Sequence, residues 1–176
     1  TELNEKGVAL AKVTGKALMD VPFYCCFTSP LKRARETARL VLNGREIPVY
    51  PDERIQEISF GDWEGRESAL LPPSMLDNFF HHTERYQAPE GGEELSQICA
   101  RTKVFWEDIT SREELQDKTI LIASHGCAVR ALLQNVYEDA SVENFWHGKV
   151  PPNCGVNIVE VRENKAILLE EDVVYY

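Results

Sequence analysis

The sequence predicts an α/β fold, a three-layer α/β/α sandwich with a mostly parallel central sheet. Two short and almost wholly apolar runs, residues 23–27 and 119–123, have the composition of strands that are covered on both faces. Each run leads directly into a helix-type pattern, and strands that alternate with helices are typical of layered sheets. No repeat, low-complexity tract or linker divides the 176 residues, so we expect a single domain over residues 1–176.

The first half of the chain predicts two helices and two strands. Leu10, Val13 and Ala17 recur at helical spacing, and Asn4 can cap that first helix. Residues 28–30 offer a cap residue followed by proline at the first helical position. The expected elements are a helix over residues 4–19, a strand over 23–27, a helix from 30 to about 42 and a strand over 47–50.

The second half is irregular at first and then alternates again. Residues 52–65 predict an irregular loop with two glycines, and residues 66–92 predict a lid-like insertion with a short helical stretch near 75–86. The later elements are a helix over residues 93–112, a strand over 119–123, a helix to about 136 and a closing strand pair over 156–161 and 166–169, with Glu163 and Asn164 at the turn.

Composition and charge exclude several classes of protein. The net charge is −10 at pH 7 and the pI is about 4.9, and such a chain repels nucleic acid. No apolar run approaches the roughly 20 residues that span a bilayer, and the polar start has no signal-peptide pattern. Five cysteines, an odd number without a C-x-x-C pair, argue against disulfides or a zinc knuckle. We therefore expect a cytoplasmic protein without a nucleic-acid or membrane partner. The sequence does not indicate how many subunits it forms.

An anion site is predicted where the strand at 23–27 meets the next helix. A helix N-terminus offers unpaired N–H groups and a partial positive charge. Arg33 lies in the first turns, and helical side chains lean toward the N-terminus, so its planar fork can reach a phosphate there. For this segment taken alone, a capped surface helix with solvated basic residues is the simpler interpretation.

Two further residues are candidate catalytic groups. His125 lies two residues beyond the strand at 119–123 and precedes a glycine, and ligands in open α/β sheets bind beyond the carboxyl ends of strands. Glu57 lies in the loop 55–65 and is a candidate general acid, because a nearby phosphate would favour its protonated form and raise its pKa. The alternatives are a structural histidine and a solvated loop carboxylate.

Together and in this order, these motifs resemble one family, the histidine phosphatase superfamily in its phosphoglycerate mutase-like branch. The resemblance covers nearly the whole chain, and the combination is highly specific although no single motif is. The matching segments are Leu3-Asn4-Glu5-Lys6-Gly7, Thr28-Ser29-Pro30-Leu31-x-Arg33-Ala34-x-x-Thr37-Ala38, Glu57-x-x-x-Gly61-x-x-Glu64-Gly65, Pro89-Glu90-Gly91-Gly92-Glu93, Ser124-His125-Gly126 and Asn153-Cys154-Gly155.

The resemblance implies a mechanism and a role for each candidate residue. In this family a histidine attacks phosphorus, and the phosphoryl group passes through a phosphohistidine intermediate. Two arginines and a second histidine hold its oxygens, while a carboxylic acid protonates the leaving oxygen and later activates water. Matching motif positions make Arg33 the phosphate clamp, His125 the second histidine and Glu57 the proton donor. The resemblance implies no metal and no cofactor.

The chain departs from the family pattern at its start. The family's R-H-G motif, with the nucleophilic histidine and the first arginine, precedes the helix with which this sequence begins. We therefore expect a histidine-phosphatase-like domain that lacks its first strand here, and an upstream segment in the native protein. His81, His82 and His147 do not fill the nucleophile's role convincingly. A native chain that starts at Thr1 would be a non-catalytic phosphate-binding relative.

The favoured function is a phosphomonoester hydrolase that acts on a small phosphorylated metabolite. Phosphoglycerate mutase activity fits less well, because residues 66–92 are acidic and aromatic, with few basic residues to grip a phosphoglycerate carboxylate. The aromatic residues of this insertion predict leaving-group contacts and packing on the body equally well.

Two other chemistries are set aside on spacing. A cysteine-based phosphatase needs C-x5-R, but Cys127 has its arginine three residues on, and the spacing from Cys26 to Arg33 is one residue too long. Asp77, His81 and Glu84 have helical ligand spacing, yet solvated charge is the simpler interpretation, and we expect no metal.

Overall fold

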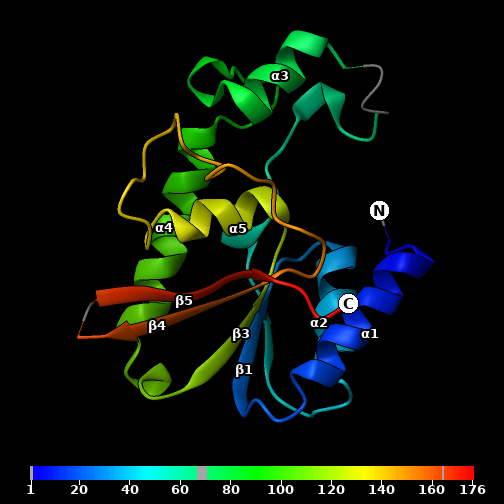
Figure 1. The fold of residues 1–176 in the computed structure, drawn as a ribbon, viewed down its shortest axis with the longest axis vertical. Coiled ribbons are helices and arrows are strands. Elements are labelled where there is room, and N and C mark those ends of the chain that lie inside the picture. The colour runs from blue at the N-terminus through cyan, green and yellow to red at the C-terminus, as the bar shows by residue number, and fades with distance from the viewer. Residues whose placement is uncertain (1, 67–70, 164) are drawn as a thin grey trace.

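The architecture is that of a computed structural model, which describes residues 2–66, 71–163 and 165–176 (Figure 1). The helices are α1 (Glu5–Ala17), α2 (Lys32–Leu42), α3 (Pro73–His81), α4 (Leu95–Ser111) and α5 (Gly126–Leu133). The strands are β1 (Phe23–Thr28), β2 (Val49–Pro51), β3 (Thr119–Ala123), β4 (Val156–Arg162) and β5 (Lys165–Val173). Short 3-10 helices are η1 (Glu53–Ile55), η2 (Gly61–Trp63), η4 (Thr83–Arg85) and η5 (Glu113–Leu115). In the described parts of the chain, no helix has the length and apolar character needed to cross a membrane.

The predicted order of elements agrees with this architecture, and the Asn4 cap is present, since its side chain accepts from the Gly7 N–H at 2.8 Å. Several predicted boundaries are wrong, among them the end of α5, at Leu133 rather than about 136, and the last strand, which is Lys165–Val173 rather than 166–169. The second helix begins at Lys32 rather than Pro30, and the residue before it, Leu31, makes no side-chain cap bond. The predicted helical stretch 75–86 is divided into α3 and η4, because His82 takes φ −137° and ends the first helix.

The central sheet is parallel, with strand order β2-β1-β3. Neighbouring residues of β1 point to opposite faces. Cys25 packs with Phe105 of α4 and Leu132 of α5, whereas Cys26 packs with Ala38 of α2. Helices α1 and α2 thus cover one face and helices α4 and α5 cover the other (Figure 1). The predicted three-layer α/β/α class is confirmed.

The closing strand pair forms as predicted, but as a two-stranded antiparallel sheet of its own, β4 against β5. Among the described residues, β3 pairs with a strand along one edge only, the edge that faces β1. Ile120, Leu121 and Ile122 of β3 are accordingly only half-buried, although they form a central apolar run. The predicted turn residue Asn164 lies outside the described residues.

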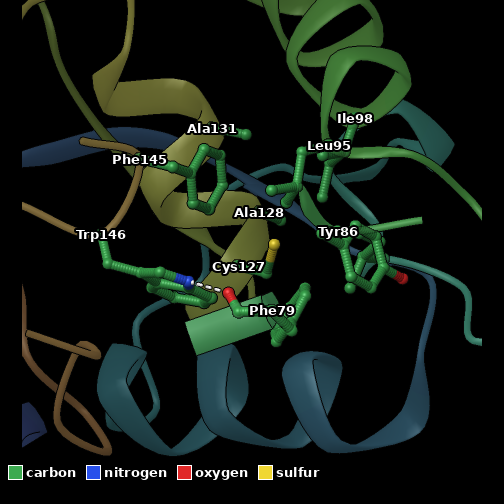
Figure 2. Packing of buried hydrophobic residues seen from close by; sticks show 10 residues of the cluster. Phe79, Tyr86, Leu95, Ile98, Cys127, Ala128, Ala131, Phe145 and Trp146 are labelled. Atoms are coloured by element: carbon green, nitrogen blue, oxygen red, sulfur yellow. Dashed lines mark hydrogen bonds between the residues drawn. The ribbon is translucent and has the colours of Figure 1, made fainter. Parts of the chain in front are cut away.

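An aromatic cluster attaches α3 to the body of the domain (Figure 2). Phe79 lies at its centre, 4% exposed, with edge-to-face contacts to Tyr86 and Trp146. The indole Nε1 of Trp146 donates to the Phe79 carbonyl at 2.6 Å. Cys127, in the first turn of α5, belongs to the same cluster. Two of the aromatic residues of the 66–92 insertion therefore pack on the body, while Phe80 is exposed. The lid itself stays a prediction, and residues 67–70 fall outside the described chain.

Candidate active site

Arg33 and His125 meet where the two strand-to-helix junctions lie side by side. His125 follows β3 and caps α5 with an extended backbone, and Arg33 is the second residue of α2. The Arg33 Nε–H donates to His125 Nδ1 at 3.1 Å, and His125 Nε2 lies 2.8 Å from the Ser29 hydroxyl. Since Nδ1 accepts a hydrogen bond, the ring is neutral and its proton is on Nε2. Burial, followed by the positive charges of Arg33 and Arg101, lowers the pKa of His125 to about 4.

Ser29 is the partner of His125 that the sequence analysis missed. Its residue is fully buried, and its hydroxyl also accepts the Leu31 N–H at 3.3 Å. The Ser29 N–H donates to the Ala123 carbonyl at 2.9 Å, which joins the ends of β1 and β3. This backbone bond holds Ser29 beside the end of β3, between β1 and α2, which begins at Lys32 rather than at Pro30. The strand-end location of a small hydroxyl residue was the signal available in the sequence.

Glu57 reaches the same place from the loop after η1. Its Oε1 accepts from the Ala128 N–H at 3.1 Å and the Ile58 N–H at 3.2 Å, and its Oε2 lies 3.5 Å from the Cys127 nitrogen. The carboxylate thus occupies the N-terminal turn of α5, where the helix leaves N–H groups unpaired. Burial raises the pKa of Glu57, against the opposing effects of these N–H groups and of Arg33.

The loop that carries Glu57 is tied to the body on two sides. The Ser124 hydroxyl donates to the Ile55 carbonyl at 2.7 Å. Arg101 of α4 donates to the Arg54 carbonyl at 2.8 Å and to the Glu57 carbonyl at 3.3 Å. These bonds fix the backbone next to the candidate acid without using its side chain.

The structure brings the three predicted site residues together and leaves the other histidines elsewhere. His81 and His82 lie at the end of α3, and the His147 ring stacks on Tyr137 with centroids 3.6 Å apart. Within residues 2–66, 71–163 and 165–176, no group of three or more metal-ligating side chains is arranged to hold an ion. The catalytic roles of Arg33, Glu57 and His125 stay predictions.

Cys127 adjoins this site but has the properties of a core residue. It is 3% exposed, and burial raises the pKa of its thiol well above the ordinary value, helped by the nearby Glu57 carboxylate. A thiol in these surroundings stays protonated, which removes the nucleophile that a cysteine-based phosphatase needs.

A family model, the histidine phosphatase superfamily (branch 1), matches residues 1–172. The chain belongs to the histidine phosphatase superfamily. The resemblance stated from the motifs is therefore confirmed.

Two known proteins show how this histidine phosphatase relates to its family. It is 31% identical over 156 residues to the adenosylcobalamin/alpha-ribazole phosphatase of Salmonella typhimurium, an alignment that covers 88% of this chain and 76% of the relative. It is 32% identical over 140 residues to the 2,3-bisphosphoglycerate-dependent phosphoglycerate mutase 2 of Gloeobacter violaceus, covering 76% of this chain and 64% of the relative. Both a phosphatase and a mutase thus lie at similar sequence distance.

A solved structure supports the fold of the histidine phosphatase. Bacillus stearothermophilus YhfR superposes with a TM-score of 0.89 at 32% identity, over 98% of this chain and 86% of that one. The named relatives include several phosphatases, so the predicted enzyme type is confirmed at the level of the family.

Proposed function

We propose that this protein is a phosphomonoester hydrolase that acts through a phosphohistidine intermediate on a small phosphorylated metabolite. The observation that carries the proposal is the convergence of Arg33 and His125, 3.1 Å apart, with the Glu57 carboxyl in the helix turn that follows His125. A guanidinium fork suits phosphate oxygens, and a buried carboxyl with a raised pKa suits proton donation. The alpha-ribazole phosphatases among the relatives support hydrolysis of a small phosphomonoester.

The proposed reaction has two steps. A histidine nitrogen forms a bond to phosphorus, the ester P–O bond breaks, and Glu57 gives its proton to the leaving oxygen. Water oxygen then forms a bond to the phosphorus of the phosphohistidine while Glu57 takes a proton from that water. The N–P bond breaks, which frees the histidine and releases inorganic phosphate. Arg33 and His125 hold the phosphoryl oxygens in both steps, for which the two side chains exchange the bond that joins them for bonds that each donates to phosphate. Charge stabilisation of this kind is usually the largest single contribution to the rate.

The nucleophile is the histidine that the family resemblance places in an R-H-G segment before the first helix. Arg33 and His125 lie at the carboxyl ends of β1 and β3, the edge where such a parallel sheet binds its ligands. We propose that the native protein supplies the nucleophile at this edge. The intact mass of the native protein tests this point directly.

Hydrolysis is favoured over mutase chemistry by the charges near the insertion. Residues 66–92 contain two arginines and no lysine. Arg66 lies over the Trp63 ring at 4.6 Å, and Arg85 pairs with Glu84 at 3.2 Å. An acidic surrounding of this kind opposes the carboxylate of a phosphoglycerate.

The experiment measures turnover of p-nitrophenyl phosphate by protein that carries the R-H-G segment. We expect inorganic phosphate release, an acid-labile phosphohistidine signal in the ³¹P spectrum after rapid mixing, and no loss of activity in EDTA. Protein that begins at Thr1, without that segment, is the control and is expected to show no turnover. Interconversion of phosphoglycerates faster than phosphate release would establish the mutase alternative, and absence of turnover in the longer protein would favour a phosphate-binding relative.

We also assign the protein to the cytoplasm. All five cysteines have free thiols, and Cys25, Cys26 and Cys127 are buried. A chain built for an oxidising compartment at this size more often pairs its cysteines. Cell fractionation, with the protein detected in each fraction by an antibody, checks this assignment.

A further inference from the structure

Arg101 makes four hydrogen bonds that bear on the Glu57 loop. On one side of the guanidinium, Nε and Nη2 donate to the two carboxylate oxygens of Glu93 at 2.6 and 2.8 Å. On the other side, Nη1 donates to the Arg54 carbonyl at 2.8 Å and Nη2 to the Glu57 carbonyl at 3.3 Å. The side chains of Arg101 and Glu93 are 23% and 17% exposed, so this pair is largely withdrawn from solvent.

Glu93, the other end of this pair, is fixed to the same loop. Its N–H donates to the Ser59 carbonyl at 2.8 Å, and Phe60 and Gly92 form an antiparallel bridge. Gly61, with φ +50°, lies so close to this turn that an added Cβ would be 2.1 Å from the Glu90 carbonyl oxygen. The loop around Glu57 is thus held between α4 and the 89–93 turn, and Arg101 joins both.

The Arg112–Asp108 pair on the same helix provides a comparison. Arg112, at the C-terminal end of α4, also donates twice to a carboxylate, at 3.0 and 2.8 Å, but its partner is four residues away within the helix, whereas Glu93 lies outside α4 and eight residues from Arg101. Both of these hydrogen bonds end on the Asp108 side chain rather than on the backbone of the loop that carries Glu57. The hydrogen bond from Arg101 to the Glu57 carbonyl therefore joins α4 to this loop, which the Arg112–Asp108 pair does not do.

We propose that Arg101 is a positioning residue, which holds the backbone of residue 57 so that the Glu57 carboxyl stays at the N-terminal turn of α5. The proposal rests on the proposed function, in which that carboxyl is the proton donor. A proton donor must stay within hydrogen-bond reach of the leaving oxygen. A planar guanidinium can hold a carboxylate and two carbonyls at once, whereas a lysine ammonium lacks the fork.

The Ala128 amide reports the position of the Glu57 carboxyl without any catalysis. It is the third N–H of α5, and the first intrahelical bond is the one from the Val129 N–H to the His125 carbonyl. Its acceptor in the structure is Glu57 Oε1 at 3.1 Å. Hydrogen exchange at this amide therefore speeds up when the carboxyl moves away.

The first experiment is amide exchange by NMR on protein that carries the R-H-G segment, with Arg101→Lys and with Arg112→Lys as the matched control. We expect the Ala128 amide to exchange at least about tenfold faster in Arg101→Lys, while the amides of β1 and β3 keep their rates. Unchanged exchange at Ala128 would overturn the proposal, as would an equal acceleration in Arg112→Lys. If Arg101→Lys fails to fold, Glu93→Gln weakens the same fork and is judged by the same amide and the same criteria.

The second experiment uses catalytically competent protein that carries the R-H-G segment. Arg101→Lys should slow an alkyl phosphate, whose leaving group needs a proton, on the order of 10- to 100-fold more than p-nitrophenyl phosphate. In a Glu57→Gln background the same change should add little, because the proton is already missing. Equal slowing of both substrates would overturn the positioning role. If the unaltered enzyme has no phosphatase activity, the proposed function fails, and the Ala128 amide still decides the role of Arg101.

Discussion

Acid should destabilise this protein through His125, by an amount that follows from its surroundings. The pKa of His125 is lowered from 6.5 to about 4 by burial and by the charges of Arg33 and Arg101. Between these two pH values the imidazole is protonated in the unfolded chain but not in the folded chain. The contribution of His125 to the free energy of unfolding is therefore complete above pH 6.5 and falls as the pH drops toward 4. At 1.36 kcal/mol for each pKa unit the full difference is ~3 kcal/mol, of which ~2.5 kcal/mol is lost by pH 4.5.

The assay is urea denaturation at pH 7.5 and pH 4.5 of the unaltered chain and of His125→Gln. Glutamine can still accept from Arg33 and donate to Ser29, but it does not titrate. We expect the free energy of unfolding to fall by ~2.5 kcal/mol more in the unaltered chain than in His125→Gln. Equal losses in the unaltered chain and in His125→Gln would refute the reasoning.

Three further predictions test the remaining groups. Arg33→Ala in catalytically competent protein should cost about 2–4 kcal/mol of transition-state stabilisation, or roughly 30- to 1,000-fold in kcat/KM. The control is Arg35→Ala, which changes an exposed arginine of the same helix and should alter kcat/KM little. Full activity of Arg33→Ala would remove Arg33 from the mechanism. Glu57→Gln should slow substrates with poor leaving groups more than those with good ones, and a constant ratio of rates would count against the acid role. Because burial raises the pKa of Glu57, the free energy of unfolding of this variant should rise relative to that of the unaltered chain as the pH rises above 4.5. Trp146→Phe leaves the buried Phe79 carbonyl without its 2.6 Å partner and should lower the free energy of unfolding by about 1–3 kcal/mol, more than Trp106→Phe at a less buried site; equal losses would show that ring volume rather than the indole N–H matters.

Much of the candidate site was predictable because sequence order and sheet topology are linked. His125 and Arg33 both follow apolar strand runs, and parallel strands bring their carboxyl ends to one edge of the sheet. Two residues that are 92 positions apart in sequence therefore meet. The family motifs added Glu57, whose loop has no periodicity that could have placed it.

The rest depended on contacts that no local pattern records. Arg101 lies 44 residues from Glu57. The sequence around it on α4 does not distinguish it from a solvated helical arginine. Ser29 suggested a helix cap, and its hydroxyl does accept the Leu31 N–H. The same hydroxyl also meets His125, 96 residues away, and no local pattern records that contact. The separation of β4–β5 from the parallel sheet was likewise invisible, because a strand pair has the same alternation in either arrangement.

The way Arg101 grips its loop also determines how mutants at residue 57 can be interpreted. The grip is on carbonyl oxygens of residues 54 and 57, which every amino acid possesses. A change of side chain at residue 57 thus leaves the hydrogen bonds between Arg101 and the loop backbone in place. Rates measured for a series of substitutions at this one residue should therefore report on the supplied proton rather than on a displaced loop.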